Sequence, residues 1–482
     1  MKPIILVFTG AFLSFGQCTE IPLVPLGSIN GHAAYGDASS SNGLVSWLSL
    51  YQCNVAYQAL LPAVNFWVNS MPQDGFGNPM WYGYDYATIA NPPVGQTSMA
   101  IVSGMAGAVI QAGLNWQAFS GDSSMLNNAI DFVSFVLANG LSGSGASWPS
   151  VPYSGSHNVT YPYDGWEPPQ NPVLGTVEPD KMAYMGYWLV KLYEQTSTTV
   201  WLTQATHYAD VLVDKQITGD STHSPWPFRV NSLTGASISN YTGNAYDACG
   251  LFSELIAINQ HGAHSVADYA AARESAITWL KTYPVATNYW DNCCEDEPGS
   301  ITPGTNIAAP VALYAALYFL QHNSEDSSFL GIAEGIVSYV TANFGVTDLG
   351  GAVTIKEQAE YNTVTTGSTA LYAWDNALLS TLTEGSTSAS YQAVALHSFN
   401  WVSYMVTATS GGLSGQADAV PSAPQLFFRA SNVNMLQFMI GAVLTLPSLG
   451  SATTSVSLPA TPPSLLPLSP NTRIVGVLTD NP

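Results

Sequence analysis

Basic residues are the scarcest chemical class in this sequence. Only 10 Lys and Arg stand against 32 Asp and Glu, which gives a formal net charge of −22, and only 9% of the 482 residues are charged. So negative a field repels the phosphates of nucleic acids and the surface of an anionic membrane, which excludes both as partners. It also disfavours a highly anionic polymer, so the charge balance favours a neutral ligand.

Long hydrophobic runs are also absent, since no stretch reaches the roughly 18 apolar residues that a membrane span requires. The N-terminus has Lys2, an apolar run over 4–15 and small residues near 16, which is the layout of a cleaved signal peptide. We expect residues 1–18 to be removed and the mature protein to be secreted and extracellular. A lipid anchor at Cys18 is the alternative, but the residues before it form a poor lipobox.

Asn158 and Asn240 each begin an Asn-X-Thr sequon. Such a sequon marks a glycosylation site on a surface loop of a secreted protein. Both asparagines are therefore candidate sites if the chain is made in a eukaryotic host.

Helical periodicity recurs along the chain, whereas sustained strand alternation is scarce. The sequence, 47% hydrophobic, predicts twelve helices, at about 44–69, 97–116, 122–139, 178–195, 198–215, 243–260, 265–281, 306–322, 326–343, 367–383, 387–407 and 430–446.

The links between these helices alternate between short and long. The long links cover 70–96, 140–177, 216–242, 282–305, 344–366 and 408–429. In an up-and-down series of helices, such alternation puts all long links at one end. The helix after each long link is also the more apolar one, as in the stretch AAPVALYAALYFL. Six apolar helices inside six amphipathic ones describe a closed double ring.

This arrangement resembles the six-hairpin glycosidase superfamily, whose fold is an all-α, six-hairpin α/α toroid with its active site in a funnel at one end. The resemblance covers about 44–446 and implies a toroid domain over 19–447. An open solenoid is the alternative, but its repeats are about 34–47 residues long, and the starts of the last five apolar helices (178, 243, 306, 367, 430) lie 61–65 residues apart. Residues 448–482, rich in Pro, Ser and Thr, read as an extended C-terminal arm.

The long links hold aromatic side chains and carboxylates, which together suit a sugar because aromatic rings stack on its C–H faces and carboxylates bind its hydroxyls. Packing of the loops against one another is the alternative role for any single ring. The candidate substrate-binding residues are Trp81, Tyr84, Tyr163, Trp166, Trp226, Arg229, Tyr289, Trp290, Tyr361 and Arg429. The two arginines could clamp a substrate carboxylate or tie acidic loops together by ion pairs.

The stretch YWDNCCEDEPGS, 289–300, is the densest group of acids in the chain. Glycoside hydrolysis needs one protonated and one ionised carboxyl group, and crowded acids raise each other's pKa. We expect Glu295 or Asp296 to be catalytic. The partner acid should come from another loop, and the candidates are Asp85, Asp164 and Asp180.

The same stretch has three other interpretations. A plain surface turn is one; a calcium site is another, although no EF-hand motif is present. A zinc site at Cys293 and Cys294 lacks nearby histidines. We expect no cofactor and no metal. Cys249 could bridge to Cys293 or Cys294 and pin the loop to the ring, and buried unpaired thiols are the alternative.

Two acids stand on inner helices. Asp247 lies one turn into its helix, near enough to the N-terminus to cap it or to point into the funnel, and Asp375 lies deeper along another helix. An acid on so apolar a helix needs a partner, which favours a structural hydrogen bond.

The leading functional hypothesis is a secreted glycoside hydrolase that uses a carboxylate pair on a polysaccharide or oligosaccharide. A polysaccharide lyase or sugar epimerase on the same fold is the first alternative, with Tyr or His as proton-transfer groups. The second is a non-catalytic extracellular protein that binds glycans or has a structural role.

Overall fold

The computed structural model describes residues 102–154, 175–290, 309–347, 352–356, 364–408 and 431–450, with positions 60, 64 and 68 and five short strands elsewhere. It contains eleven α-helices in these residues: α2 (Val102–Ser120), α3 (Ser124–Asn139), α4 (Pro179–Thr196), α5 (Thr199–Lys215), α6 (Ala245–Ala257), α7 (Val266–Leu280), α8 (Ala309–Gln321), α9 (Phe329–Phe344), α10 (Thr366–Leu382), α11 (Gly385–Ala408) and α12 (Ser431–Thr445). None of the described helices is long and apolar enough to cross a bilayer.

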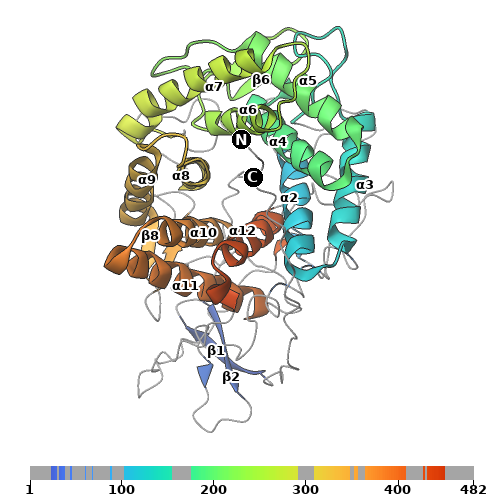
Figure 1. Ribbon diagram of the computed structural model, residues 1–482. Helices are drawn as coiled ribbons and strands as arrows, with labels where there is room; N and C mark the ends of the chain where they lie inside the picture. Colours follow the sequence, from blue (N-terminus) through green and yellow to red (C-terminus); the bar gives the residue numbers. More distant parts are fainter. Residues whose placement is uncertain are drawn as a thin grey trace.

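The even-numbered helices form the inner ring. Each contacts the next even-numbered helix along the chain, and α12 packs on α2 to close the circle. The odd-numbered helices each pack outside the even-numbered helix that precedes them, as Figure 1 shows for α3, α9 and α11. The predicted all-α double ring and the assignment of the apolar helices to its inside are thus confirmed.

Local sequence signals explain where the helices begin and end. Ser265 caps α7 in a capping box with Asp268, and Pro179 occupies the first turn of α4, where its missing N–H is no loss. The tight α2–α3 link passes through Gly121 at φ +78°, a conformation that favours glycine. The signals at Ser265 and Gly121 belong to short links, which join the C-terminal end of each inner helix to its outer partner.

The inner helices approach closely because small residues face large rings. A Cβ at Gly107 of α2 would lie 2.5 Å from the Tyr184 ring of α4. At Gly441 of α12 it would lie 2.7 Å from the ring of Trp374 of α10. These two contacts leave no room for a larger residue, so the glycines set how near the helices lie.

The long links enter the N-terminal ends of the inner helices and carry short strands. β5 (Thr176–Val177), β6 (Arg229–Asn231) and β7 (Ser237–Ser239) form one sheet, and β8 (Gly345–Thr347) pairs with β9 (Val353–Ile355). β4 (Ala87–Thr88) pairs with β10 (Phe427–Phe428). This last pair joins the first and last long links where the ring closes.

The N-terminal segment contains the longest strands. β1 (Leu23–Ile29), β2 (His32–Asp37) and β3 (Leu44–Val45) form an antiparallel sheet, and β2 contacts α11 (Figure 1). The predicted helix over 44–69 is therefore wrong at its first two residues, because they pair with Tyr35 and Gly36 of β2. Leu60 and Val64, farther along the same prediction, are helical and buried.

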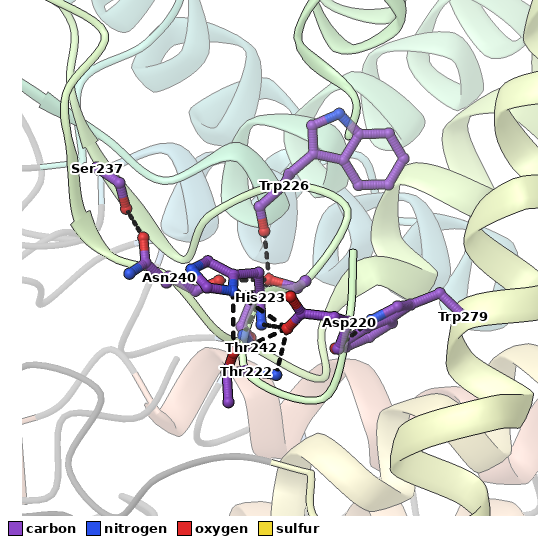
Figure 2. Close-up of polar contacts among 9 residues, drawn as sticks. Asp220, Thr222, His223, Trp226, Ser237, Asn240, Thr242 and Trp279 are labelled. Atoms are coloured by element: carbon purple, nitrogen blue, oxygen red, sulfur yellow. Dashed lines mark hydrogen bonds and ion pairs between the residues drawn. The ribbon is translucent and has the colours of Figure 1, made fainter. Parts of the chain in front are cut away.

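The link between α5 and α6 is ordered by Asp220. Its Oδ1 accepts hydrogen bonds from the backbone N–H groups of Thr222 (2.7 Å) and His223 (2.9 Å). Its carbonyl accepts from Trp279 Nε1 on α7 (2.9 Å), which ties the link to the outer ring (Figure 2). Side-chain and backbone hydrogen bonds therefore hold this long loop in one conformation, and the loop positions the residues that lead into α6.

Candidate functional site

A cavity opens along the ring axis at the long-loop end. It encloses about 340 Å³ of space, part of it open to solvent, between the N-terminal halves of α4, α6 and α8. A second hollow of about 490 Å³ continues from the same side chains toward the short-link end. The side chains common to both are Tyr184, Tyr246, Asp247 and Tyr314. We call the two hollows together the axial cavity.

A polar network forms one wall at the loop end. Asp180 Oδ2 accepts from Lys181 Nζ (3.1 Å) and from Asn244 Nδ2 (2.7 Å). Tyr246 donates its hydroxyl to Asn244 Oδ1 (2.7 Å). All four side chains are buried, and Asp180 Oδ1 has no hydrogen-bond partner in the described part of the chain. Because a buried carboxylate oxygen needs a donor, Oδ1 is suited to accept one from water or a bound hydroxyl.

Asp247 is the acid that lines both halves of the axial cavity, and it is only half-buried. It lies in the first turn of α6, where its backbone N–H donates to the Asn244 carbonyl (3.0 Å). This acid was expected to cap its helix or to point into the funnel, and its place on the cavity wall agrees with the second expectation.

Tyr314 is the centre of an aromatic cluster on the axis. Its ring stacks on Tyr246 (centroids 6.2 Å apart, planes at 13°) and meets Tyr184 edge-on (6.4 Å, 75°). Phe438 of α12 meets it at 5.3 Å and 73°. Rings from four inner helices therefore converge here, and they offer an apolar face to a ligand.

The hydroxyl of Tyr184 joins this cluster to the ring closure. It donates to Gln111 Oε1 of α2 (2.7 Å), with Gln437 Oε1 of α12 at 3.2 Å. Burial, followed by the nearby Tyr314 and Asp247, raises the pKa of Tyr184 well above its usual value. Burial and Asp247 raise the pKa of Tyr314 in the same way. Both phenols are therefore neutral hydrogen-bonding groups at neutral pH.

The short-link half of the axial cavity contains a histidine. His322 stacks on Tyr318 (4.5 Å), and its Nδ1 lies 2.9 Å from Glu325 Oε1. Burial, with the cations of Arg273 and Lys191, lowers the pKa of His322 to about 4. Its imidazole is therefore neutral at neutral pH.

The predicted site residues that the structure describes lie in different places. Asp180 lies beside the axial cavity, as part of the polar wall. Trp226 and Trp290 are buried among protein atoms, with 3% and 0% of their surface exposed. Trp226 Nε1 donates to the Leu212 carbonyl (2.8 Å), and the Tyr289 ring packs 4.8 Å from Tyr241. These rings pack the loops against the helices, which is the alternative role considered for them.

Arg229 binds another part of the protein. Its Nε and Nη2 donate to Glu178 Oε1 at 3.0 and 2.6 Å, and both side chains are buried. Glu178 is the residue before α4, so the pair fixes β6 against the start of the helix that bears Asp180. Of the two roles considered for this arginine, the ion pair between loop and ring is the one present.

Of the two states considered for Cys249, a bridge to the loop or a buried unpaired thiol, the second is present, because Cys249 is free and buried. Its sulfur faces the Arg273 carbonyl of α7 at 3.9 Å, on the outer side of α6. Burial raises the pKa of this thiol far above its usual value. The physical reason is its position, since the sulfur is buried between α6 and the outer helix α7.

The other predicted site residues lie outside the described residues. They are the acids Asp85, Asp164, Glu295 and Asp296, the binding candidates Trp81, Tyr84, Tyr163, Trp166, Tyr361 and Arg429, the thiols Cys293 and Cys294, and the sequon residue Asn158. Within the described part of the chain, no three His, Cys, Asp or Glu side chains are grouped as a metal site would require.

Sequence reasoning missed Lys181, Tyr184, Asn244, Tyr246 and Tyr314. One signal could have found them, because each lies at the start of an inner helix just after a long link. A polar residue in the first two turns of an otherwise apolar helix has no place in the packing between helices. It must face the axis or cap the helix.

Comparisons with known proteins show the fold. No protein-family model matches the sequence, and the search of curated proteins finds no relative. A sugar epimerase from a ruminal bacterium is similar over 80% of this chain and 97% of its own (TM-score 0.58, 10% identity). Cellobiose 2-epimerase from Spirochaeta thermophila is similar over 81% and 95% (0.58, 13%). A family 76 glycoside hydrolase from a bovine Bacteroides thetaiotaomicron strain is similar over 86% and 84% (0.54, 12%).

These identities are too low to transfer an activity. The structural matches agree with the double ring of paired helices. The chain has the six-hairpin α/α toroid fold that glycoside hydrolases and sugar epimerases share.

Proposed function

We propose that this protein is a secreted glycoside hydrolase that acts on a neutral glycan in the axial cavity. The observation that carries the proposal is the meeting of two carboxyl groups with an aromatic cluster at the long-loop end. Asp247 lines the axial cavity, and Asp180 is bound to Lys181 and Asn244, which also line it. One oxygen of Asp180 has no hydrogen-bond partner in the described chain. Aromatic faces and a few convergent polar groups are what a sugar ring requires.

The two acids take different roles in this proposal. Asp180 is held in an ion pair with Lys181, so it supplies the carboxylate that activates water or attacks the anomeric carbon. Asp247 supplies the proton that the leaving glycosidic oxygen receives. Asn244 and Lys181 orient Asp180 through its other oxygen, which leaves Oδ1 without a hydrogen-bond partner among the described residues. Glu295 and Asp296 stay candidates for the acid from the neighbouring loop.

The neutral substrate follows from charge. Lys181 and Arg229, two cations near this end, are each bound to a carboxylate of the protein. A uronic acid polymer would meet a chain of net charge −22, and neither of these two described cations is set aside for its carboxylates. This charge balance disfavours a polysaccharide lyase.

A sugar epimerase is the second candidate, and His322 is the observation that favours it. An imidazole that is neutral at neutral pH can accept a proton from a sugar carbon or hydroxyl. With a pKa of about 4, however, it is a weak base. It also lies at the end of α8, far from the long loops, so we rank the hydrolase first.

The proposal is tested by incubating the purified protein with a panel of neutral plant, fungal and algal glycans. Hydrolysis releases new reducing ends, whereas epimerisation changes the sugar without releasing any. We expect Asp247→Asn to keep its melting temperature and to lose at least about a hundredfold in turnover, as removal of a general acid does. Asp131→Asn, an exposed acid of the outer helix α3, is the matched control and should keep full activity.

Two results would reject the assignment. Full activity in both Asp247→Asn and Asp180→Asn would move the catalytic acids to other loops, where Glu295→Gln and Asp296→Asn are the next variants. If the protein binds a glycan but produces neither new reducing ends nor an epimer, it is a glycan-binding protein and not an enzyme of either class. Sequencing of the secreted chain tests export, which requires a new N-terminus after residues 16–18.

A further inference from the structure

The sequon Asn240-Tyr241-Thr242 lies between β7 and α6, and its three residues differ in exposure. Asn240 is exposed, whereas Tyr241 and Thr242 have 5% and 2% of their surface exposed. The asparagine alone therefore reaches the surface. A covalent addition at Asn240 has room, and the residues that follow it hold the loop in place.

The hydrogen bonds of Asn240 leave its amide nitrogen unused. Oδ1 accepts from Ser237 Oγ (2.5 Å), and the backbone carbonyl accepts from the N–H (3.0 Å) and Oγ (3.2 Å) of Ser224. The described hydrogen bonds include none from Nδ2, which points away from Ser237 and the Asp220 cluster in Figure 2. A group on Nδ2 would therefore break no hydrogen bond of the folded loop.

We propose that Asn240 is an N-glycosylation site, used when the chain passes through a eukaryotic secretory pathway. The bond that forms joins Nδ2 to the anomeric carbon of the first sugar. The bond that breaks joins that carbon to a lipid diphosphate, which leaves, and Nδ2 loses one proton. The Thr242 hydroxyl completes the acceptor motif before folding. After folding it accepts from the Asn244 N–H (3.1 Å) instead.

The surroundings of Asn240 suit a glycan. The turn 217–225 lies beside Asn240, because the Ser224 N–H donates to the Asn240 carbonyl. Two apolar side chains of this link are exposed, Ile217 at 47% and Ile238 at 37%. A glycan at this position covers part of this apolar surface. It would stand on the segment that leads, four residues later, to Asn244 of the axial cavity, so the modification belongs to the long-loop end of the ring.

The test is secretion of the full chain from yeast behind the yeast's own leader. The product is treated with peptide N-glycosidase in heavy-oxygen water, and its peptides are mapped by mass spectrometry. We expect Asp with the heavy label at position 240 in the treated protein. Asn240→Gln should lose the mass of one glycan and keep its melting temperature, because the side chain is exposed.

Asn158→Gln removes the other sequon, so any glycan that remains is attached at Asn240. Thr242→Ser keeps the hydroxyl that the motif requires. Both variants should retain the glycan at Asn240. The proposal is overturned if the secreted, folded Asn158→Gln protein yields only unmodified peptide at position 240. This result would leave the proposed hydrolase untouched, since that activity depends on other residues.

Discussion

Asn244 Nδ2 donates to Asp180 Oδ2 over 2.7 Å and so joins the start of α6 to the start of α4. Its Oδ1 at the same time accepts from Tyr246. The amide thus donates to a carboxylate and accepts from a phenol, and Oδ1 of Asp180 is left without a hydrogen-bond partner among the described residues. The side chain that orients the candidate carboxylate comes from a different long loop than the carboxylate itself.

The first prediction concerns the contribution of the Asn244 amide to the free energy of unfolding. Asn244→Ala leaves Asp180 without one donor and the Tyr246 hydroxyl without its acceptor, so we expect a loss of about 1–3 kcal/mol in the free energy of unfolding. Urea denaturation measures it. Asn127→Ala, at an exposed position of α3, is the control and should change this free energy by less than about 0.5 kcal/mol. Equal effects at the two positions would contradict the network.

The ion pair of Arg229 with Glu178 gives a second prediction. Arg229→Met removes the guanidinium from the buried carboxylate of Glu178, which should lower the free energy of unfolding by about 3–5 kcal/mol. Glu178→Gln in the same chain should restore most of the loss, since no buried charge remains. The pair of Lys281 with Asp326, whose side chains are 32% and 37% exposed, is the control, and Lys281→Met should have an effect of at most about 1 kcal/mol. A double variant no more stable than Arg229→Met would show that the charge is not the cause.

Glycines of inner and outer helices should respond in opposite ways to the same change. Gly107→Ala puts a methyl group 2.5 Å from the Tyr184 ring, so it should lower the free energy of unfolding by about 1–3 kcal/mol. Gly331→Ala on α9 meets nothing within 4 Å and should raise it by about 0.5–1 kcal/mol through helix propensity. The midpoints of urea denaturation distinguish the two signs. A gain in stability in both variants would mean that the ring tolerates wider helix spacing.

The double ring could be predicted because its signals are local. Apolar helices such as 309–321, which is buried at eleven positions, cannot lie at a surface, and alternating link lengths leave one arrangement for them. The pairing of β4 with β10 could not be predicted, because two-residue strands 339 positions apart (88 to 427) leave no periodic signal. The residues around the axial cavity could be predicted only in part. Asp180 was found as an acid at a helix start, but its link to Asn244 depends on how two loops meet.

Asp375 gives the last prediction, which concerns pH. It lies on α10 with no exposed surface, and neither carboxylate oxygen has a hydrogen-bond partner among the described residues. The expected structural hydrogen bond for this acid is therefore absent there. Burial raises the pKa of Asp375 well above its usual value.

The sign of the effect follows from proton binding. The folded state keeps the proton of Asp375, whereas the unfolded chain releases it above about pH 3.9. The unfolded state is therefore favoured as pH rises from about 4 toward the folded pKa, and stability falls in that window. Asp375→Asn has no such proton to lose. Its free energy of unfolding, relative to the unchanged protein, should rise by at least about 1 kcal/mol from pH 4 to pH 7 in urea denaturation. Asn127→Ala, at an exposed position of α3 that does not titrate, is the control and should show no comparable change between the two pH values. A difference between Asp375→Asn and the unchanged protein that stays constant with pH would mean that water or a polar group reaches Asp375 in the folded state.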